Sequence, residues 1–211
     1  MIKMLTAHTA EIDDAQSAVA EVLEQHELDH HQKTNTVGII NCYSEFIESG
    51  VVKALCDALG FEVIGCTTIA TAVNRSSSMM QLSLSVLTSD DISFTTMHTE
   101  KLSPGNMKGP MECAYKQACG THEGKPAWIV TYLPLFLHLG GQQMLDVFGQ
   151  VTGDVPCYGT IVCDHTLDLS TSQVMQNGEG YSESMVMLLL WGETKPTFLI
   201  ATISKELMQK Q

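Results

Sequence analysis

The chain has 211 residues, with 24 acidic and 11 lysine or arginine side chains, and a formal net charge of −13 at pH 7. A surface of this charge repels phosphate groups, which excludes nucleic acids and anionic membranes as partners. Arg75 is the single arginine, so no group of guanidinium side chains can clamp an anion. The hydrophobic fraction of 44% and the charged fraction of 17% predict a globular protein with a substantial core.

The N-terminal segment and the cysteines indicate the compartment. The chain reaches the acidic residues Glu11 and Asp13 without an apolar stretch of signal-peptide length. The longest apolar run, residues 185–191, is far too short to cross a bilayer. Seven cysteines without a CxxC pair are typical of reduced thiols rather than a disulfide framework. We therefore expect a cytoplasmic protein.

The first part of the chain alternates predicted helices and strands. Apolar residues recur at helical spacing over residues 11–28 and 46–59, and Gly60 follows the second helix as a C-cap. Short apolar runs over residues 36–40 and 61–66 predict buried strands. This order predicts parallel neighbouring strands joined by right-handed crossovers.

The rest of the chain is richer in predicted strands. Residues 80–87 and 92–98 predict an antiparallel hairpin, and further helices are predicted over 106–119 and 140–151. Other strands are expected at residues 128–133, 158–163, 171–177, 184–191 and 197–203. No linker and no internal repeat is visible. We predict one α/β domain over residues 1–211: a mixed sheet with a βαβ-type parallel core, antiparallel β additions and helices packed on the faces.

Several segments carry a family resemblance. Gly65-Cys66-Thr67-Thr68 follows a strand and precedes the segment 81–92, and later come Gly159-Thr160-Ile161-Val162-Cys163-Asp164, the segment 174–179 and the apolar strand 185–191. In this order they resemble the N-terminal part of the FIST domain family over residues 36–203. The chain departs from the family pattern in three places. It has Ile69-Ala70-Thr71 where a glycine is usual, Thr160 for a second glycine and Met175 for a phenylalanine.

The resemblance implies a sensory domain of signal transduction that binds a small ligand such as an amino acid and carries out no catalysis. It also implies an output protein or domain as partner. The family includes haem-binding sensors of nitric oxide, so haem is the alternative cofactor to none. The family usually has a second, C-terminal portion, so we expect this chain to be a fragment or a stand-alone half.

Three turns after predicted strands supply the first candidate binding residues: Asn41, then Gly65, Cys66, Thr67 and Thr68, and then Tyr132. Ligands of open α/β sheets bind beyond the carboxyl ends of the strands, where N–H groups and small hydroxyls hold a polar ligand end. We expect Gly65 to allow close backbone approach. The alternative is that Thr67 or Thr68 only caps the following segment.

A second group of small and polar residues comprises Tyr158, Gly159, Thr160 and Asp164. Asp164 is a candidate acceptor for a ligand ammonium, and Tyr158 a cover for an apolar ligand group. The alternative is that Asp164 and His165 form an ordinary strand-end turn in which the carboxylate bonds its own backbone.

Other chemistries are weaker in this sequence. Cys66 is a candidate nucleophile for a thiol-dependent hydrolase, although a buried, inert thiol is the alternative. His26 and His30 have the spacing of a metal pair but lack a third ligand, so no metal site is predicted. His138, with apolar neighbours, is a candidate haem ligand. A last possibility is an interaction module that forms a homodimer through the 185–191 edge or the apolar helices.

Overall fold

The computed structural model describes residues 1–26, 31–73, 76–120, 122–165 and 169–199. Its strands are β1 (Lys3–Thr9), β2 (Asn35–Cys42), β3 (Val63–Thr67), β4 (Thr71–Val73), β5 (Ser76–Ser78), β6 (Leu82–Ser89), β7 (Ser93–His98), β8 (Trp128–Leu133), β9 (Cys157–Ile161), β10 (Val174–Gln176), β11 (Glu179–Tyr181) and β12 (Val186–Trp191). Its helices are α1 (Ala15–His26), α3 (Glu45–Glu48), α4 (Val51–Leu59), α5 (Lys108–Cys119) and α6 (Gly141–Thr152), with the 3-10 turn η1 (Leu169–Thr171).

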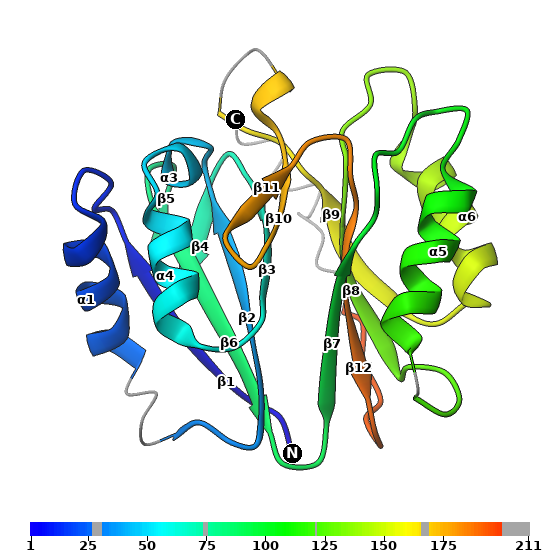
Figure 1. The fold of residues 1–211 in the computed structure, drawn as a ribbon, viewed down its shortest axis with the longest axis horizontal. Helices are drawn as coiled ribbons and strands as arrows, with labels where there is room; N and C mark the ends of the chain where they lie inside the picture. The colour runs from blue at the N-terminus through cyan, green and yellow to red at the C-terminus, as the bar shows by residue number, and fades with distance from the viewer. Residues whose placement is uncertain (27–30, 74–75, 121, 166–168, 200–211) are drawn as a thin grey trace, which may run out of the picture.

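Two sheets lie face to face, and helices cover the outer side of each (Figure 1). The first sheet has the strand order β1-β6-β2-β3-β10-β11, the second has the order β7-β12-β8-β9, and β4 and β5 form a separate hairpin. Helices α1 and α4 lie outside the first sheet, and α5 and α6 lie outside the second (Figure 1). The prediction of an α/β fold is confirmed, but the strands form two main sheets rather than one.

The predicted mixture of strand directions is also confirmed. Strand β2 is parallel to β3, and β8 is parallel to β9. The pairs β1–β6, β2–β6, β7–β12, β8–β12 and β3–β10 are antiparallel. Each parallel pair is joined through helices on the outer side of its sheet, as a βαβ crossover requires.

The hydrophobic patterns of the strands explain the layers. In β6, Leu82, Leu84 and Val86 alternate with serines and pack on the helix side of the first sheet. In β12 both faces are apolar: Leu189 packs toward α5 and α6, whereas Leu188 packs toward the first sheet. Its residues 186–191 are buried because the strand has a core on either side. Full burial of one such leucine contributes about 1.5–3 kcal/mol.

Some predicted elements are wrong in detail. Strands β6 and β7 do not form a hairpin, because the chain crosses from the first sheet to the second between them (Figure 1). The predicted helix 46–59 is divided into α3 and α4 at Gly50, whose φ is +84°. Residues 197–199 form no strand, and the rest of the predicted strand 197–203 lies outside the described residues. Strands β1, β4, β5 and β11 were not predicted.

The two sheets are built from one unit that occurs twice. The order β1-α1-β2-α4-β3, ending in β6, corresponds to β7-α5-β8-α6-β9, ending in β12. The strands β1-β6-β2-β3 and β7-β12-β8-β9 share the same sheet order and the same directions. The structure thus contains an internal repeat that the sequence does not show.

Matching glycines support this correspondence. Gly65 of β3 lies opposite Ile40 of β2, and a Cβ on Gly65 would come within 2.1 Å of the Ile40 carbonyl oxygen. Gly159 of β9 lies opposite Thr131 of β8, and a Cβ there would come within 1.6 Å of the Thr131 carbonyl oxygen. Both units therefore need a glycine at the same place in their parallel pair.

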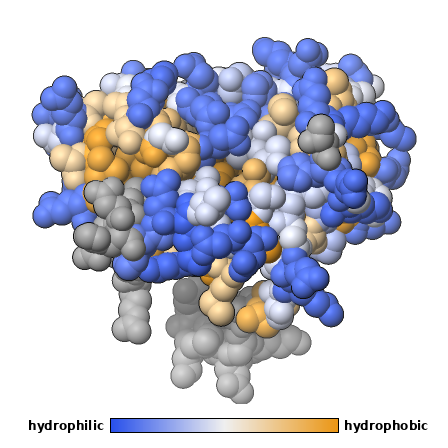
Figure 2. Space-filling model, turned by 60° about the horizontal axis from the view of Figure 1, so that its bottom comes forward, coloured by the Kyte–Doolittle hydropathy of each residue, from blue (hydrophilic) through white to orange (hydrophobic). Residues whose placement is uncertain are grey.

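No helix within the described part of the chain is long and apolar enough to cross a membrane. Figure 2 brings the bottom of the fold forward and shows hydrophilic side chains over much of this face, with hydrophobic patches between them. The hydrophilic side chains on this face agree with the net charge of −13.

Candidate functional site

A hollow of about 520 Å³ lies where the polar part of the first sheet faces the second sheet. Its lining comes from both repeated units: Met4, Thr6, Asn41, Cys66, Thr68, Ala70, Thr71, Ala72, Val73, Ser83, Ser85, Tyr132, Tyr158, Gly159 and Thr160. None of these side chains is charged, whereas hydroxyl, amide, thiol and phenol groups are all present. A volume of this size is typical of sites for small molecules.

One wall of the hollow is a row of polar side chains across the first sheet. Asn41 of β2 lies opposite Ser83 of β6 on one side and opposite Cys66 of β3 on the other. Thr6 and Ser85 lie opposite each other in β1 and β6. Side chains two residues apart on a strand share a face, so this wall follows from the pleat of the sheet.

The facing wall comes from the parallel pair of the second sheet. Tyr132 of β8 is buried, whereas Tyr158 of β9 is 65% exposed. Thr160 lies opposite Tyr132 in the parallel register. Residues 70–73, which include β4, close a third side. The hollow is therefore bounded by strands of both sheets and by β4 with the residue before it.

Asn41, Cys66 and Tyr132 meet inside the hollow. The Asn41 side-chain Nδ2 donates to the Cys66 sulfur at 3.1 Å. Burial raises the pKa of the Cys66 thiol to about 12, although the Asn41 hydrogen bond opposes this. Burial also raises the pKa of the Tyr132 hydroxyl. A thiol with this pKa is almost wholly protonated at neutral pH, so Cys66 has the properties of an inert thiol rather than a nucleophile.

The hollow brings together seven of the ten candidate binding residues: Asn41, Cys66, Thr68, Tyr132, Tyr158, Gly159 and Thr160. The three turns after predicted strands belong to two facing sheets, not to one edge of a single sheet. They nevertheless border one hollow, because the two units face each other.

Gly65, Thr67 and Asp164 do not line this hollow. Gly65 permits close approach of strand β2 rather than of a ligand. The Thr67 hydroxyl accepts from the Gln173 N–H at 3.0 Å and lies 3.3 Å from its carbonyl oxygen, so it links β3 to the segment before β10. Asp164 lies in a separate cluster. These three residues make contacts within the fold outside the hollow.

Part of the lining was not predicted from the sequence: Met4, Thr6, Ser83, Ser85 and residues 70–73. A signal for the serines was present: Leu82, Leu84 and Val86 alternate with them, so the serines had to face away from the helices. No such signal marked Thr6, because β1 was not predicted as a strand.

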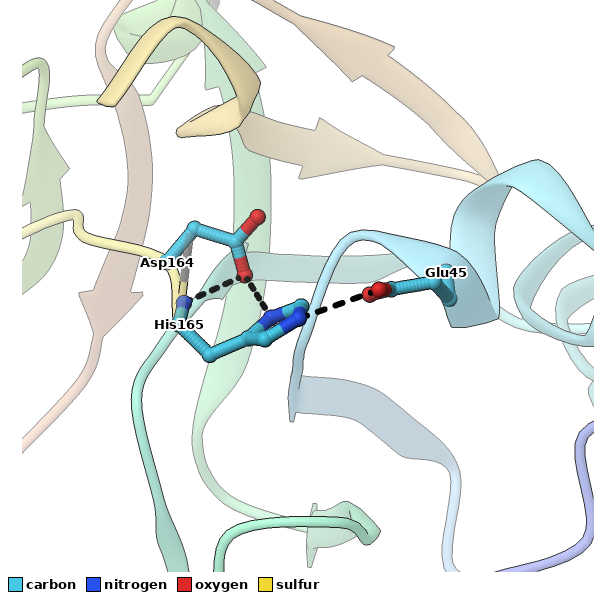
Figure 3. A group of neighbouring side chains, drawn as sticks. All are labelled: Glu45, Asp164 and His165. Atoms are coloured by element: carbon cyan, nitrogen blue, oxygen red, sulfur yellow. Dashed lines mark hydrogen bonds and ion pairs between the residues drawn. The ribbon is translucent and has the colours of Figure 1, made fainter. Parts of the chain in front are cut away.

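Asp164 belongs to a cluster with Glu45 and His165 (Figure 3). The Asp164 Oδ1 accepts from the N–H groups of Ser44 at 3.3 Å and His165 at 2.9 Å. The His165 ring lies between the two carboxylates, with Nδ1 3.1 Å from Asp164 and Nε2 3.0 Å from Glu45. These contacts link the segment after β9 to the start of α3.

The histidine candidates do not add to the hollow. His138 is exposed and lies outside the lining of the hollow. The pair His26 and His30 lies outside the side chains that the structure describes. Strand β12, the proposed dimer edge, lies between β7 and β8 and so has no open edge.

Comparisons with known proteins agree with the sequence resemblance. The FIST N domain profile matches residues 36–205 of the chain. A solved structure, "cyanuric acid hydrolase from A. caulinodans", is similar with a TM-score of 0.44 and 10% identity over 92% of this chain and 71% of the other. A likeness of that size carries no argument about activity. No curated protein matches the sequence.

The family match covers most of the chain, including both parallel strand pairs and nearly all of the hollow. FIST domains are sensory domains of signal transduction. The chain belongs to the FIST N domain family.

Proposed function

We propose that this sensory domain binds a small ligand, with an amino acid as the first candidate, in the hollow between the two sheets. The observation that carries the proposal is the lining: residues of both units converge on one hollow, and all of its side chains are uncharged. Such a site suits a neutral or zwitterionic molecule, because a ligand with net charge would be desolvated without a charged partner.

The lining has the groups that such a ligand needs. Ser83 and Ser85 supply hydroxyls on the first sheet, and Tyr132 and Thr160 supply them on the second. Asn41 offers both a donor and an acceptor. A ligand held between these walls contacts both units at once and changes how they sit against each other. We propose that an output protein or domain reads this change.

A thermal-shift screen of the purified chain with the twenty amino acids tests the proposal. A ligand at about a hundred times its dissociation constant stabilises the folded state by about 2.7 kcal/mol. We expect shifts from neutral amino acids and none from aspartate, glutamate, lysine or arginine. If no amino acid shifts the unfolding temperature at millimolar concentration, the amino-acid proposal is wrong.

A pair of serine variants locates the site. Ser85 lies in the hollow, whereas Ser93 is a half-buried serine of β7 outside its lining. We expect Ser85→Ala to weaken binding about two- to tenfold, as the loss of one neutral hydrogen bond does. Ser93→Ala is the matched control and should bind as the wild type does. If both variants bound the ligand equally well, the ligand would bind outside this hollow.

A further inference from the structure

The repeated unit leaves the same strand covered in one copy and open in the other. In the first sheet, the outer edge of β3 pairs with β10 of the hairpin β10–β11. In the second sheet β9 holds the corresponding position, and no strand among the described residues pairs with its outer edge. All five residues of β3 are buried, whereas β9 is exposed at its three central residues. An open strand edge carries unpaired N–H and C=O groups.

Beside β9 there is a hollow at the position that corresponds to the β10–β11 hairpin beside β3. The β10–β11 turn packs on α4, where Gly178 lies against Lys53 and Cys56. Helix α6 corresponds to α4. Beside it, a hollow of about 360 Å³ is lined by residues of α6, β8 and β9, among them Gly141, Leu145 and Ile161. Leu145 is 36% exposed. In the second unit, no segment of the described residues therefore occupies the place that the hairpin holds in the first.

The chain also contains a hairpin of the right form without an acceptor. Strands β4 and β5 pair only with each other among the described strands. Each hairpin has three residue pairs, and the last pair is Val73 with Ser76 in one and Gln176 with Glu179 in the other. In the chain, β4–β5 lies between β3 and β6 of the first unit, and β10–β11 lies between β9 and β12 of the second. By position and length, β4–β5 is the counterpart of β10–β11.

We infer that this chain forms a homodimer in which the β4–β5 hairpin of one copy pairs with β9 of the other. The arrangement repeats between copies what β10 and β3 do within one. The register of β10 on β3, with Met175 opposite Gly65, places Ala72 opposite Gly159. The strands β4 and β9 both line the 520 Å³ hollow. In the dimer, the hairpin of each copy would therefore lie at the edge of its partner's hollow.

Hairpin geometry identifies a variant that blocks this pairing. Directly after β10, the Asn177 N–H donates to Val63 of β3, and because ladder bonds alternate along a strand, the Met175 N–H points to the same edge. Ala72 and Ser77 are the counterparts of Met175 and Gly180, so their backbone N–H groups point away from the hairpin on opposite edges. The Ala72 N–H faces the proposed partner strand. Ala72→Pro removes that donor, and Ser77→Pro is the matched control because it removes one on the far edge.

Sedimentation velocity and hydrogen exchange together test the inference. We expect a dimer for the wild type and for Ser77→Pro. For Ala72→Pro we expect a dissociation constant at least about tenfold higher, and faster exchange of the amides of residues 157–161. Dilution of the wild type below its dissociation constant should likewise speed exchange at these amides. This measurement tests the inference even if Ala72→Pro does not fold.

Three results would overturn the inference. The first is a wild type that stays monomeric at about 100 µM, since its dissociation constant would then be weaker than that concentration. The second is a dimer that Ala72→Pro leaves intact, since another surface would then hold it. The third is slow exchange of β9 that does not depend on concentration, because a segment of the same chain would then cover the edge.

Discussion

Asp164 is buried, and its carboxyl is nevertheless held in the ionised form. Burial alone raises the pKa of this carboxyl, but hydrogen bonds from Thr171, Ser44 and His165 outweigh it and hold the pKa below its ordinary value. A carboxyl with a lowered pKa in the folded state contributes stability above its unfolded pKa, near 4. That stability is lost as the pH falls through the lower, folded pKa.

Replacing Asp164 by asparagine should therefore lower the free energy of unfolding at pH 7 by about 1–3 kcal/mol, the range for a buried group that loses its hydrogen-bond partner. As the pH falls from about 5 to about 2, the variant should lose less stability than the wild type. In this range the Asp164 carboxyl of the wild type takes up a proton, first in the unfolded and then in the folded state. Urea unfolding at several pH values measures both. Asp13→Asn, at an exposed carboxyl, is the control. Parallel pH curves for wild type and Asp164→Asn would contradict this account.

At the same scale, the sequence could predict much of the site but not all of it. Asn41, Cys66 and Tyr132 were predictable because ligands gather at strand ends, and all three line the hollow. Asp164 was not separable from them, since a carboxylate after a strand serves a ligand or a neighbouring backbone N–H equally well. Only the position of Ser44, 120 residues away along the chain, decides between the two.

At the scale of elements, the parallel pairs depend on Gly65 and Gly159. A Cβ at either position would meet a backbone carbonyl oxygen of the neighbouring strand, which cannot move aside as a flexible side chain does. Gly65→Ala and Gly159→Ala should each lower the free energy of unfolding by more than about 2 kcal/mol, because the strands must separate locally. Urea unfolding of the purified variants measures the loss.

Gly105→Ala is the matched control for these two variants. A Cβ at Gly105 has no heavy atom within 4 Å, so its effect should stay within about 0.5 kcal/mol. If Gly159→Ala were as stable as Gly105→Ala, the close approach of β8 and β9 would not be a constraint on the fold.

At this scale, sequence patterns predicted most strands and helices but not which strands pair. Alternation identified residues 80–87 as a strand, and its closeness in sequence to residues 92–98 predicted a hairpin, but alternation does not encode which strands pair. The apolar run over residues 185–191 predicted a buried strand, and β12 is apolar on both faces because it separates two cores. Gly50 divides a predicted helix because its φ is positive.

At the scale of the whole molecule, the two units share a core. Residues of both sheets, among them Ile64 and Val174 of the first and Val130 and Leu188 of the second, pack together between the layers. The sequence gives no sign of the repeat, because the two units preserve strand order and one glycine position rather than side-chain identity. A shared core between the sheets predicts that the units do not unfold independently.

The two tryptophans allow this to be measured. Trp128 and Trp191 both lie in the second sheet, so their fluorescence follows the second unit, whereas far-UV circular dichroism follows helices of both. We expect the two signals to give one coincident urea transition. Leu188→Ala, which opens a cavity in the shared core, should lower the free energy of unfolding by about 2–5 kcal/mol and shift both signals together. Fluorescence and circular dichroism transitions that separate would mean instead that each unit is stable alone and that the hollow lies between two independently folded halves.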